Sequence, residues 1–236
     1  MLYFFMFLIG ACLGSFINVI FSRKDWYMGR SRCDNCGYIL KWYDMIPIIG
    51  YTVLRGKCRK CGTKIDSSHF FAELFMGTAF IVMSVCIERY NNMYALLVCI
   101  TLFLFSVYAI EDMKEKAIYS WLLNMGVLST AILKGYIIYK IGTENLYIYI
   151  FAVVMIKIFF WAVSKAVRKI GAGDFDMFIM LYILFGDYGC MLCLMLSSFI
   201  GCVIYLPAIF LKKYDRKEPM ALAPLLFIGT MYCVLV

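Results

Sequence analysis

Histidine is almost missing from this chain, because His69 is the only one among 236 residues. A His-Glu-x-x-His zinc-protease site needs two histidines and is therefore excluded. A serine or cysteine nucleophile would have to use His69 as its base, and a lone histidine at the start of an apolar stretch is more often a packing or interfacial residue. Acid–base chemistry in this chain therefore depends on carboxylates.

Charge is also scarce. Only 16% of the residues are charged, 64% are hydrophobic, and the mean hydropathy is +0.83. A soluble domain carries about 25% charged residues, so the composition predicts an all-α integral membrane protein that contacts the lipid bilayer. No basic residue precedes the first apolar stretch, which favours an uncleaved first span over a secretory signal.

The apolar stretches give the number of spans, since a spanning helix needs about 20 apolar residues. The sequence predicts about eight transmembrane helices, of which the sixth is short. Only Gly186-Asp187-Tyr188-Gly189 separates the sixth from the seventh. The predicted spans are Leu2–Phe21, Phe70–Ile87, Tyr94–Ile110, Ser120–Tyr139, Leu146–Val163, Phe175–Phe185, Cys190–Leu211 and Leu222–Val236.

Basic residues alternate between the loops and predict the topology. The loops at 22–69, 111–119, 164–174 and 212–220 hold 10, 2, 3 and 4 Lys and Arg. The intervening loops hold only Arg89 and Lys140. Cationic loops stay in the cytoplasm, so we expect a multi-pass protein of the cytoplasmic (inner) membrane with both termini outside. The +8 net charge is thus a topology signal, and no nucleic-acid partner is expected.

Four cysteines in the first cytoplasmic loop form two Cys-x-x-Cys-Gly turns with 21 residues between them: Cys33, Cys36, Cys58 and Cys61. Such a turn lets two sulfurs reach one metal ion, and four thiolates suit tetrahedral Zn²⁺. Disulfides are the alternative, but a cytoplasmic loop is reducing. A complete four-sulfur shell predicts a structural role for the zinc. The remaining cysteines, including Cys190 and Cys193, fall in apolar spans, where cysteine is usually a small hydrophobe.

The sequence divides accordingly into three parts. We expect a first transmembrane helix at residues 1–22 and a cytoplasmic zinc-binding loop at 23–69. A membrane-embedded helical bundle follows at 70–236.

Two aspartates, Asp112 and Asp174, stand where apolar stretches meet cytoplasmic loops. Two carboxylates close together share a proton, so that one activates water while the other polarises a scissile carbonyl. Gly171 and Gly173 would let the backbone and an extended substrate approach Asp174. The alternative is a solvated acid at a helix end, where Asp174 would also gain from the helix dipole.

Other charges near the spans need an interpretation too. Glu111, Glu115 and Asp176 are neighbouring carboxylates that could be confused with the pair. Charge inside a span tends to be functional, so Glu73, about one turn into the second span, is an accessory candidate together with Asp176. Lys134 and Lys157 lie off-centre in their spans and are expected to snorkel towards the interface.

With these residues assembled, the chain resembles the type IV prepilin peptidases of the cysteine-containing bacterial kind, over nearly its whole length. The first aspartate segment is Asp112-Met113-Lys114, and Gly171-Ala172-Gly173-Asp174 resembles the second. The other matching segments are Gly14-Ser15-Phe16-Ile17-Asn18-Val19, Trp42-Tyr43-Asp44-Met45-Ile46-Pro47, Leu54-Arg55-Gly56-Lys57-Cys58-Arg59, Glu73 and Met220-Ala221-Leu222-Ala223-Pro224-Leu225.

The chain departs from the family pattern beside both aspartates. Ile118-Tyr119-Ser120 stands where the family usually has Ile-Pro followed by Asp or Asn. Asp176 replaces a lysine that usually follows the second aspartate by two places. We expect this exchange to remove a positive charge beside the pair and to add a negative one.

The resemblance implies a membrane aspartic endopeptidase with Asp112 and Asp174 as catalytic residues. Its substrates would be prepilins or pseudopilins, cut at the cytoplasmic face after a glycine. Many family members also N-methylate the new amino terminus with S-adenosylmethionine, and the cysteine loop is associated with that activity.

Two functions from other classes stay open. An ion-coupled transporter would use the aspartates and in-span lysines as a relay. A non-cleaving, zinc-stabilised assembly factor for pili or secretion would tolerate loss of either aspartate.

Overall fold

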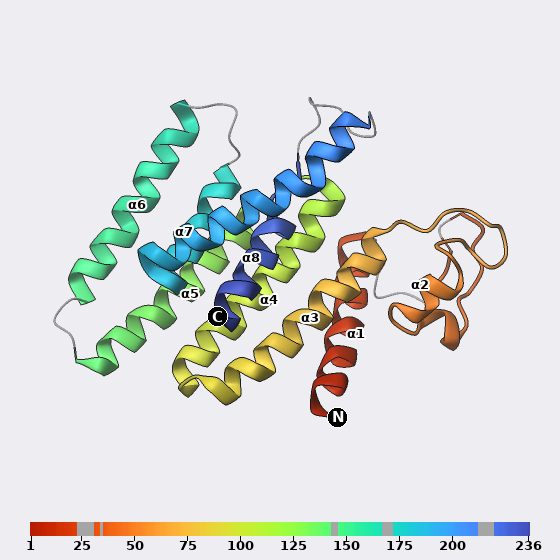
Figure 1. The fold of residues 1–236 in the computed structure, drawn as a ribbon, viewed down its shortest axis with the longest axis horizontal. Coiled ribbons are helices and arrows are strands. Elements are labelled where there is room, and N and C mark those ends of the chain that lie inside the picture. The colour runs from red at the N-terminus through yellow and green to blue at the C-terminus, as the bar shows by residue number, and fades with distance from the viewer. Residues whose placement is uncertain (23–30, 34, 143–145, 167–171, 212–219) are drawn as a thin grey trace.

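The computed structural model describes residues 1–22, 31–33, 35–142, 146–166, 172–211 and 220–236. Most of these residues are helical and none belongs to a named strand, which confirms the all-α prediction. Two isolated β-bridges occur in the cysteine loop. The long helices lie side by side, with α6 at one edge of the bundle and the cysteine loop beyond the other (Figure 1). The helices are α1 (Leu2–Ser22), η1 (Trp42–Met45), α2 (Ile49–Val53), α3 (Ser68–Arg89), α4 (Asn92–Glu115), α5 (Ser120–Ile141), α6 (Leu146–Ala166), α7 (Ala172–Phe210) and α8 (Ala223–Leu235).

Six of the described helices are long and apolar enough to cross a membrane, and α8 is a shorter apolar helix. The helix α7 consists of two limbs, because Gly186 has non-helical angles (φ 70°, ψ −164°) that bend the chain. Glycine adopts a positive φ at little cost. With the two limbs of α7 counted separately and the short α8 added, the described part of the chain has eight apolar helical segments at the places of the eight predicted spans. The predicted break at residues 186–189 is narrower in the structure, where only Gly186 leaves the helix.

The second limb of α7 runs antiparallel to α8. An added Cβ at Gly229 would meet the Ser197 hydroxyl, and one at Gly201 would meet Leu225. Cys190 and Cys193 are buried in the apolar core on this limb, so the prediction that they serve packing is confirmed.

Small residues join α1 to α3. An added Cβ at Gly14 would collide with the backbone oxygen of Ala72, and one at Gly10 would lie 2.5 Å from that of Met76. The Gly-x-x-x-Gly spacing therefore lets the two backbones approach closely.

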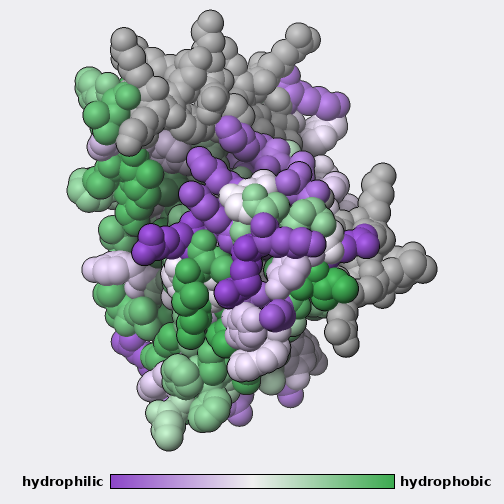
Figure 2. Space-filling model, turned by 90° about the vertical axis from the view of Figure 1, so that its right-hand side faces the viewer, coloured by the Kyte–Doolittle hydropathy of each residue, from purple (hydrophilic) through white to green (hydrophobic). Residues whose placement is uncertain are grey.

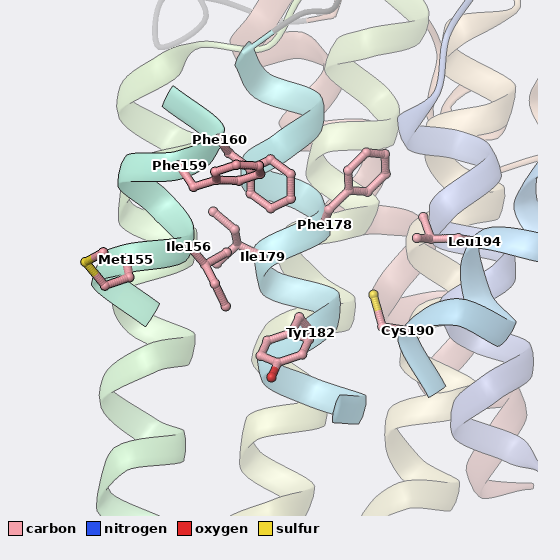
Figure 3. A pocket seen from close by; sticks show the side chains of 9 residues that line it. All are labelled: Met155, Ile156, Phe159, Phe160, Phe178, Ile179, Tyr182, Cys190 and Leu194. Atoms are coloured by element: carbon pink, nitrogen blue, oxygen red, sulfur yellow. The ribbon is translucent and has the colours of Figure 1, made fainter. Parts of the chain in front are cut away.

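The main core lies among α3, α4, α5, α7 and α8. It includes the fully buried side chains of Phe105, Tyr108, Met180 and Phe227. At one edge, α6 and the two limbs of α7 flank an apolar cavity of about 570 Å³ (Figure 3). Phe178 points into this cavity from the first limb of α7, and Leu194 faces it from the second.

The helix directions define two ends of the bundle. At one end the Tyr3 hydroxyl donates to Glu88 Oε2 (3.0 Å), and the Tyr90 hydroxyl donates to the carbonyl of Val234 (2.9 Å). Both chain termini therefore lie at this end. The cysteine loop, which joins α1 to α3, leaves from the opposite end.

Candidate active site and metal centre

The two predicted aspartates lie at the end of the bundle from which the cysteine loop leaves. Asp112 is in the last turn of α4, which extends to Glu115 and so past the predicted end of the span at Ile110. Asp174 is in the first turn of α7. Asp112 lies near enough to Asp174 for its charge to act on the Asp174 carboxyl group. The fold therefore brings together two carboxylates that are 62 positions apart in the sequence.

Asp112 also holds the start of another helix. Its side chain is buried, and its Oδ2 accepts a hydrogen bond from the backbone N–H of Ala223 (2.9 Å). Ala223 is the first residue of α8, and Pro224 follows it in the first turn. The first N–H groups of a helix have no partner within it, and a carboxylate also favours the positive end of the helix dipole. Asp112 thus links the end of α4 to the start of α8.

The neighbouring carboxylates have other partners. Glu111 is 1% exposed, and its Oε1 accepts a hydrogen bond from the N–H of Tyr119 (3.1 Å) at the start of α5. Its second oxygen, Oε2, is buried without a partner in the described part of the chain. Glu115 is exposed. Glu111 therefore has a backbone partner of its own at the start of α5, and Glu115 faces the surface.

Asp176 forms a small polar cluster with residues of α5 and α6. Lys157 Nζ lies 3.6 Å from Asp176 Oδ1 and donates a hydrogen bond to Asn124 Oδ1 (2.7 Å). Lys157 therefore reaches across the bundle edge to an acid, whereas the sequence predicted that it snorkels. Its ammonium also neutralises Asp176, so Asp176 is not the uncompensated negative charge that the sequence suggested. The sequence places a lysine and an acid in adjacent spans, but it does not show that the two side chains are in contact. That contact is visible only in the structure.

Of the two glycines expected to open a cleft, Gly171 lies outside the described residues. Gly173 packs against α5, because an added Cβ would lie 2.9 Å from Leu123 Cδ1. The close contact between α7 and α5 is therefore sufficient to explain why a glycine is needed at position 173.

Glu73 lies on the α1 and α3 side of the bundle. Its Oε2 accepts a hydrogen bond from the N–H of Ile48 (2.6 Å), and Ser15 of α1 also hydrogen-bonds to it. Ile48 has φ 63°, which is costly for a β-branched residue. The carboxylate of Glu73 therefore fixes a strained turn of the cysteine loop against the bundle.

The four loop cysteines converge. Their Sγ atoms all lie within 4.8 Å of one another, and the Cys33–Cys61 and Cys36–Cys58 sulfurs are each 3.9 Å apart. A tetrahedral site with Zn–S bonds of about 2.3 Å has sulfurs about 3.8 Å apart. The cluster thus has the dimensions of a tetrahedral four-sulfur metal site.

Both halves of the cluster are built by the same turn. Gly37 N–H donates to the carbonyl of Cys33, and Gly62 N–H donates to that of Cys58 (both 2.9 Å). The two glycines have φ of 68° and 71°, a conformation that side chains other than glycine rarely adopt. The glycine after each Cys-x-x-Cys is therefore a requirement of the turn.

The surroundings of the four sulfurs shift the pKa values of two of the thiols in opposite directions. A hydrogen bond with the Thr63 hydroxyl lowers the pKa of Cys61 to about 6. For Cys36, a hydrogen bond from the Tyr38 backbone lowers the pKa, but burial and the neighbouring sulfurs raise it to about 11. Four thiolates so close together need a positive charge between them. The residues present fit a metal ion.

One polar residue in the first helix has no interpretation from the sequence. Asn18 is fully buried in α1, and both its amide nitrogen and its oxygen are without hydrogen-bond partners in the described part of the chain. In the sequence, Asn18 stands out only as a member of the segment Gly14–Val19. The burial of Asn18 could not be predicted from the sequence, because most residues of this apolar helix are exposed.

Comparisons with known proteins agree with this architecture. Residues 8–87 match the family model described as "Bacterial Peptidase A24 N-terminal domain". This segment contains α1, the cysteine loop and most of α3, and it ends before both aspartates.

Several curated relatives carry the name "Prepilin leader peptidase/N-methyltransferase". The Myxococcus xanthus protein is 36% identical over 102 residues, which is 42% of this chain and 30% of the relative. The Vibrio cholerae protein is 38% identical over 79 residues, 28% of this chain and 31% of the relative. These matches span less than a third of the two relatives.

A longer match covers the aspartates as well. The Aeromonas salmonicida protein of the same name is 23% identical over 259 residues, 95% of this chain and 87% of the relative. No solved structure gave a significant match to the chain. The chain is therefore similar to prepilin leader peptidase/N-methyltransferases along nearly its whole length, and most strongly in its N-terminal part.

Proposed function

We propose that this protein is a membrane aspartic endopeptidase that removes the leader from type IV prepilins or pseudopilins by cutting after a glycine. The observation that carries the proposal is the meeting of Asp112 and Asp174, from α4 and α7, at the end of the bundle beside the cysteine loop. The names of the relatives support the substrate class.

In the proposed reaction the two carboxylates share one proton. The ionised carboxylate takes a proton from a water molecule, whose oxygen attacks the scissile carbonyl carbon. The protonated carboxyl group donates its proton to the carbonyl oxygen. When the tetrahedral intermediate collapses, the C–N bond breaks and the leaving amine takes the proton that the first carboxylate removed from water. One hydroxyl of the intermediate returns its proton to the second carboxylate, which restores the shared-proton pair.

We also propose that the aspartates face the cytoplasm. The loops at this end are the ones rich in Lys and Arg, and such loops remain cytoplasmic. Both termini would then face outward. A prepilin would present its cleavage site at the cytoplasmic surface while its apolar helix stays in the membrane. The apolar cavity between α6 and α7 begins one turn after Asp174, at Phe178, which suits an apolar substrate.

For the four cysteines we propose a structural Zn²⁺. The sulfur distances fit tetrahedral coordination, and a complete shell leaves no position for water or substrate. The relatives are also named N-methyltransferases. We propose that methylation of the new amino terminus by this chain would use S-adenosylmethionine as the methyl donor.

Co-expression with a prepilin tests the proposal. The wild type should convert the prepilin to the shorter form, and Asp174→Asn should not, although it accumulates in the membrane to the same level. Glu115→Gln changes an exposed acid at the same end of the bundle and should cleave like the wild type. Full cleavage by Asp174→Asn would contradict the assignment and favour a non-cleaving assembly factor or a transporter.

A further inference from the structure

The cysteine loop exposes a group of large apolar side chains. Trp42, Met45, Ile49 and Val53 are 74%, 47%, 54% and 67% exposed. They lie on η1 and α2, and Ile49 and Val53 share one face of α2 because they are four residues apart. Several large apolar side chains exposed within one short stretch of a polar loop indicate an interaction surface.

The depth of this segment indicates what covers it. Ile48 is hydrogen-bonded to Glu73, which is five residues into α3 and therefore about 8 Å from the start of that helix. Ser15, which also bonds to Glu73, is seven residues and about 10 Å from the end of α1. The segment from Trp42 to Val53 thus lies level with the outer turns of the spanning helices. Figure 1 shows α2 to the side of α1 and α3, near the ends from which the loop leaves.

The lipid-facing surface of the bundle continues into this segment. Phe16 of α1, next to Ser15, is 50% exposed on a helix that is long and apolar enough to cross a membrane. Tyr51 of α2 packs against Phe70 of α3, with ring centroids 5.5 Å apart. Acyl chains that contact α1 at this depth would also contact the neighbouring apolar side chains of the loop.

The backbone of the segment is suited to a lipid boundary, where unpaired N–H and C=O groups are costly. The N–H groups of Gly50, Thr52 and Leu54 donate to carbonyls four residues earlier. The N–H of Ile48, which precedes α2, is bonded to Glu73.

A basic edge adjoins the apolar one. Lys57, Lys60 and Lys64 are exposed on the second Cys-x-x-Cys turn, where Lys57 and Lys64 stand opposite each other in a β-bridge. Arg59 of this turn is bonded to Asp44 of η1 (2.7 Å), which attaches the basic turn to the apolar segment. Hydrophilic residues gather over this face of the molecule (Figure 2).

The described part of the loop carries more basic than acidic side chains. Its described residues between 31 and 66 include seven Lys and Arg and two Asp. A basic edge beside an apolar edge is the pattern of elements that lie in the surface of an anionic membrane.

We propose that the segment from Trp42 to Val53 is inserted into the boundary between headgroups and acyl chains of an anionic bilayer. Its apolar side chains contact the lipid, and Lys57, Lys60 and Lys64 bind the lipid phosphates. The zinc-binding loop is thus anchored to the membrane surface next to α1 and α3. This proposal does not rest on the peptidase function.

Fluorescence of the full chain in vesicles tests it. A variant with Trp26→Phe, Trp121→Phe and Trp161→Phe leaves Trp42 as the only tryptophan. A matched variant that keeps only Trp121, which is 63% exposed at the start of α5, marks the depth of the bundle end. In phosphatidylcholine–phosphatidylglycerol vesicles, we expect bromines near the top of the acyl chains to quench Trp42 as strongly as Trp121. Aqueous acrylamide should quench Trp42 weakly.

Two further variants separate insertion from loss of folding. Ile49→Asp with Val53→Asp should abolish bromine quenching of Trp42 while the cysteine site keeps its metal content. Lys60→Gln with Lys64→Gln should reduce the quenching gained when phosphatidylglycerol is added. Strong acrylamide quenching of Trp42 without bromine quenching, in vesicles where Trp121 reports lipid, would overturn the proposal. Shielding of Trp42 only after a prepilin is added would overturn it too and assign the surface to substrate.

Discussion

The aspartate end of the bundle and the cysteine loop are two regions that are each stabilised in a different way. Asp112 and Asp174 sit on long helices whose packed core includes Phe105, Tyr108 and Met180. In the described residues 31–66, only Gly50, Gly56 and Cys58 are buried. A segment this short cannot bury enough apolar surface to fold by packing alone. We therefore expect that the aspartates can be changed without unfolding the bundle, whereas folding of the loop would depend on a metal ion bound by its four cysteines.

The largest expected effect is on catalysis. Asp112→Asn and Asp174→Asn should each lower the cleavage rate by roughly 10³-fold or more, and the double variant should be no slower than either single one, because the two carboxylates act as one unit. Initial rates on a purified prepilin measure this. Multiplicative losses in the double variant would mean that the two residues act independently.

The second-largest effect is expected when the proposed metal site of the cysteine loop is removed. Cys58→Ser should lose the bound Zn²⁺, about one ion per chain, and expose residues 31–66 to proteases, since metal binding and folding of such a loop are coupled. Metal analysis and limited proteolysis measure the two effects. Cys202→Ser, at an exposed cysteine of α7, is the matched control and should keep its zinc. A zinc-free wild type with a protease-resistant loop would show that the loop folds by other means.

A smaller effect is expected at the edge of the bundle. Lys157→Met and Asp176→Asn should each destabilise the attachment of α6, and their effects should be coupled by about 0.5–3 kcal/mol because the two side chains are in contact. Thermal unfolding of the purified variants in detergent gives this coupling through a double-mutant cycle. Lys134→Met, at an in-span lysine beside Tyr94, should show no coupling with Asp176→Asn.

The smallest effect concerns Gly173. Gly173→Ala should cost about 1 kcal/mol of stability, because the new methyl group displaces the end of the flexible Leu123 side chain. Gly173→Ala should also slow cleavage slightly. Adding Leu123→Val, which removes one methylene from the side chain that the new methyl group meets, should recover both stability and cleavage if the glycine serves packing between α5 and α7. If cleavage stays low in the double variant while its stability is normal, the glycine instead gives the substrate access.

Much of this architecture follows from local sequence patterns. Apolar length predicted the spans, and the Gly186 break correctly divided α7 into two limbs. The Cys-x-x-Cys-Gly turns predicted the sulfur cluster, because such a turn is fixed by a few adjacent residues.

Long-range contacts could not be predicted in this way. The bond from Ala223 to Asp112 joins residues 111 positions apart. The pairing of Lys157 with Asp176 depends on how α6 lies against α7. These tertiary contacts cannot be predicted from the hydrophobic pattern of a helix, because an apolar helix in a membrane is hydrophobic on the faces that pack and on the faces that meet lipid.

The most direct test of the account separates the two roles of Asp112. In Asp112→Asn the amide oxygen can still accept the hydrogen bond from Ala223, so the start of α8 should hold and the melting temperature should stay near that of the wild type. The variant nevertheless lacks the ionisable group that peptide hydrolysis needs. Measured side by side on one preparation, we expect near-normal melting and no prepilin cleavage. Near-normal cleavage together with near-normal melting would show that Asp112 is only a helix cap and would contradict the aspartic-peptidase account.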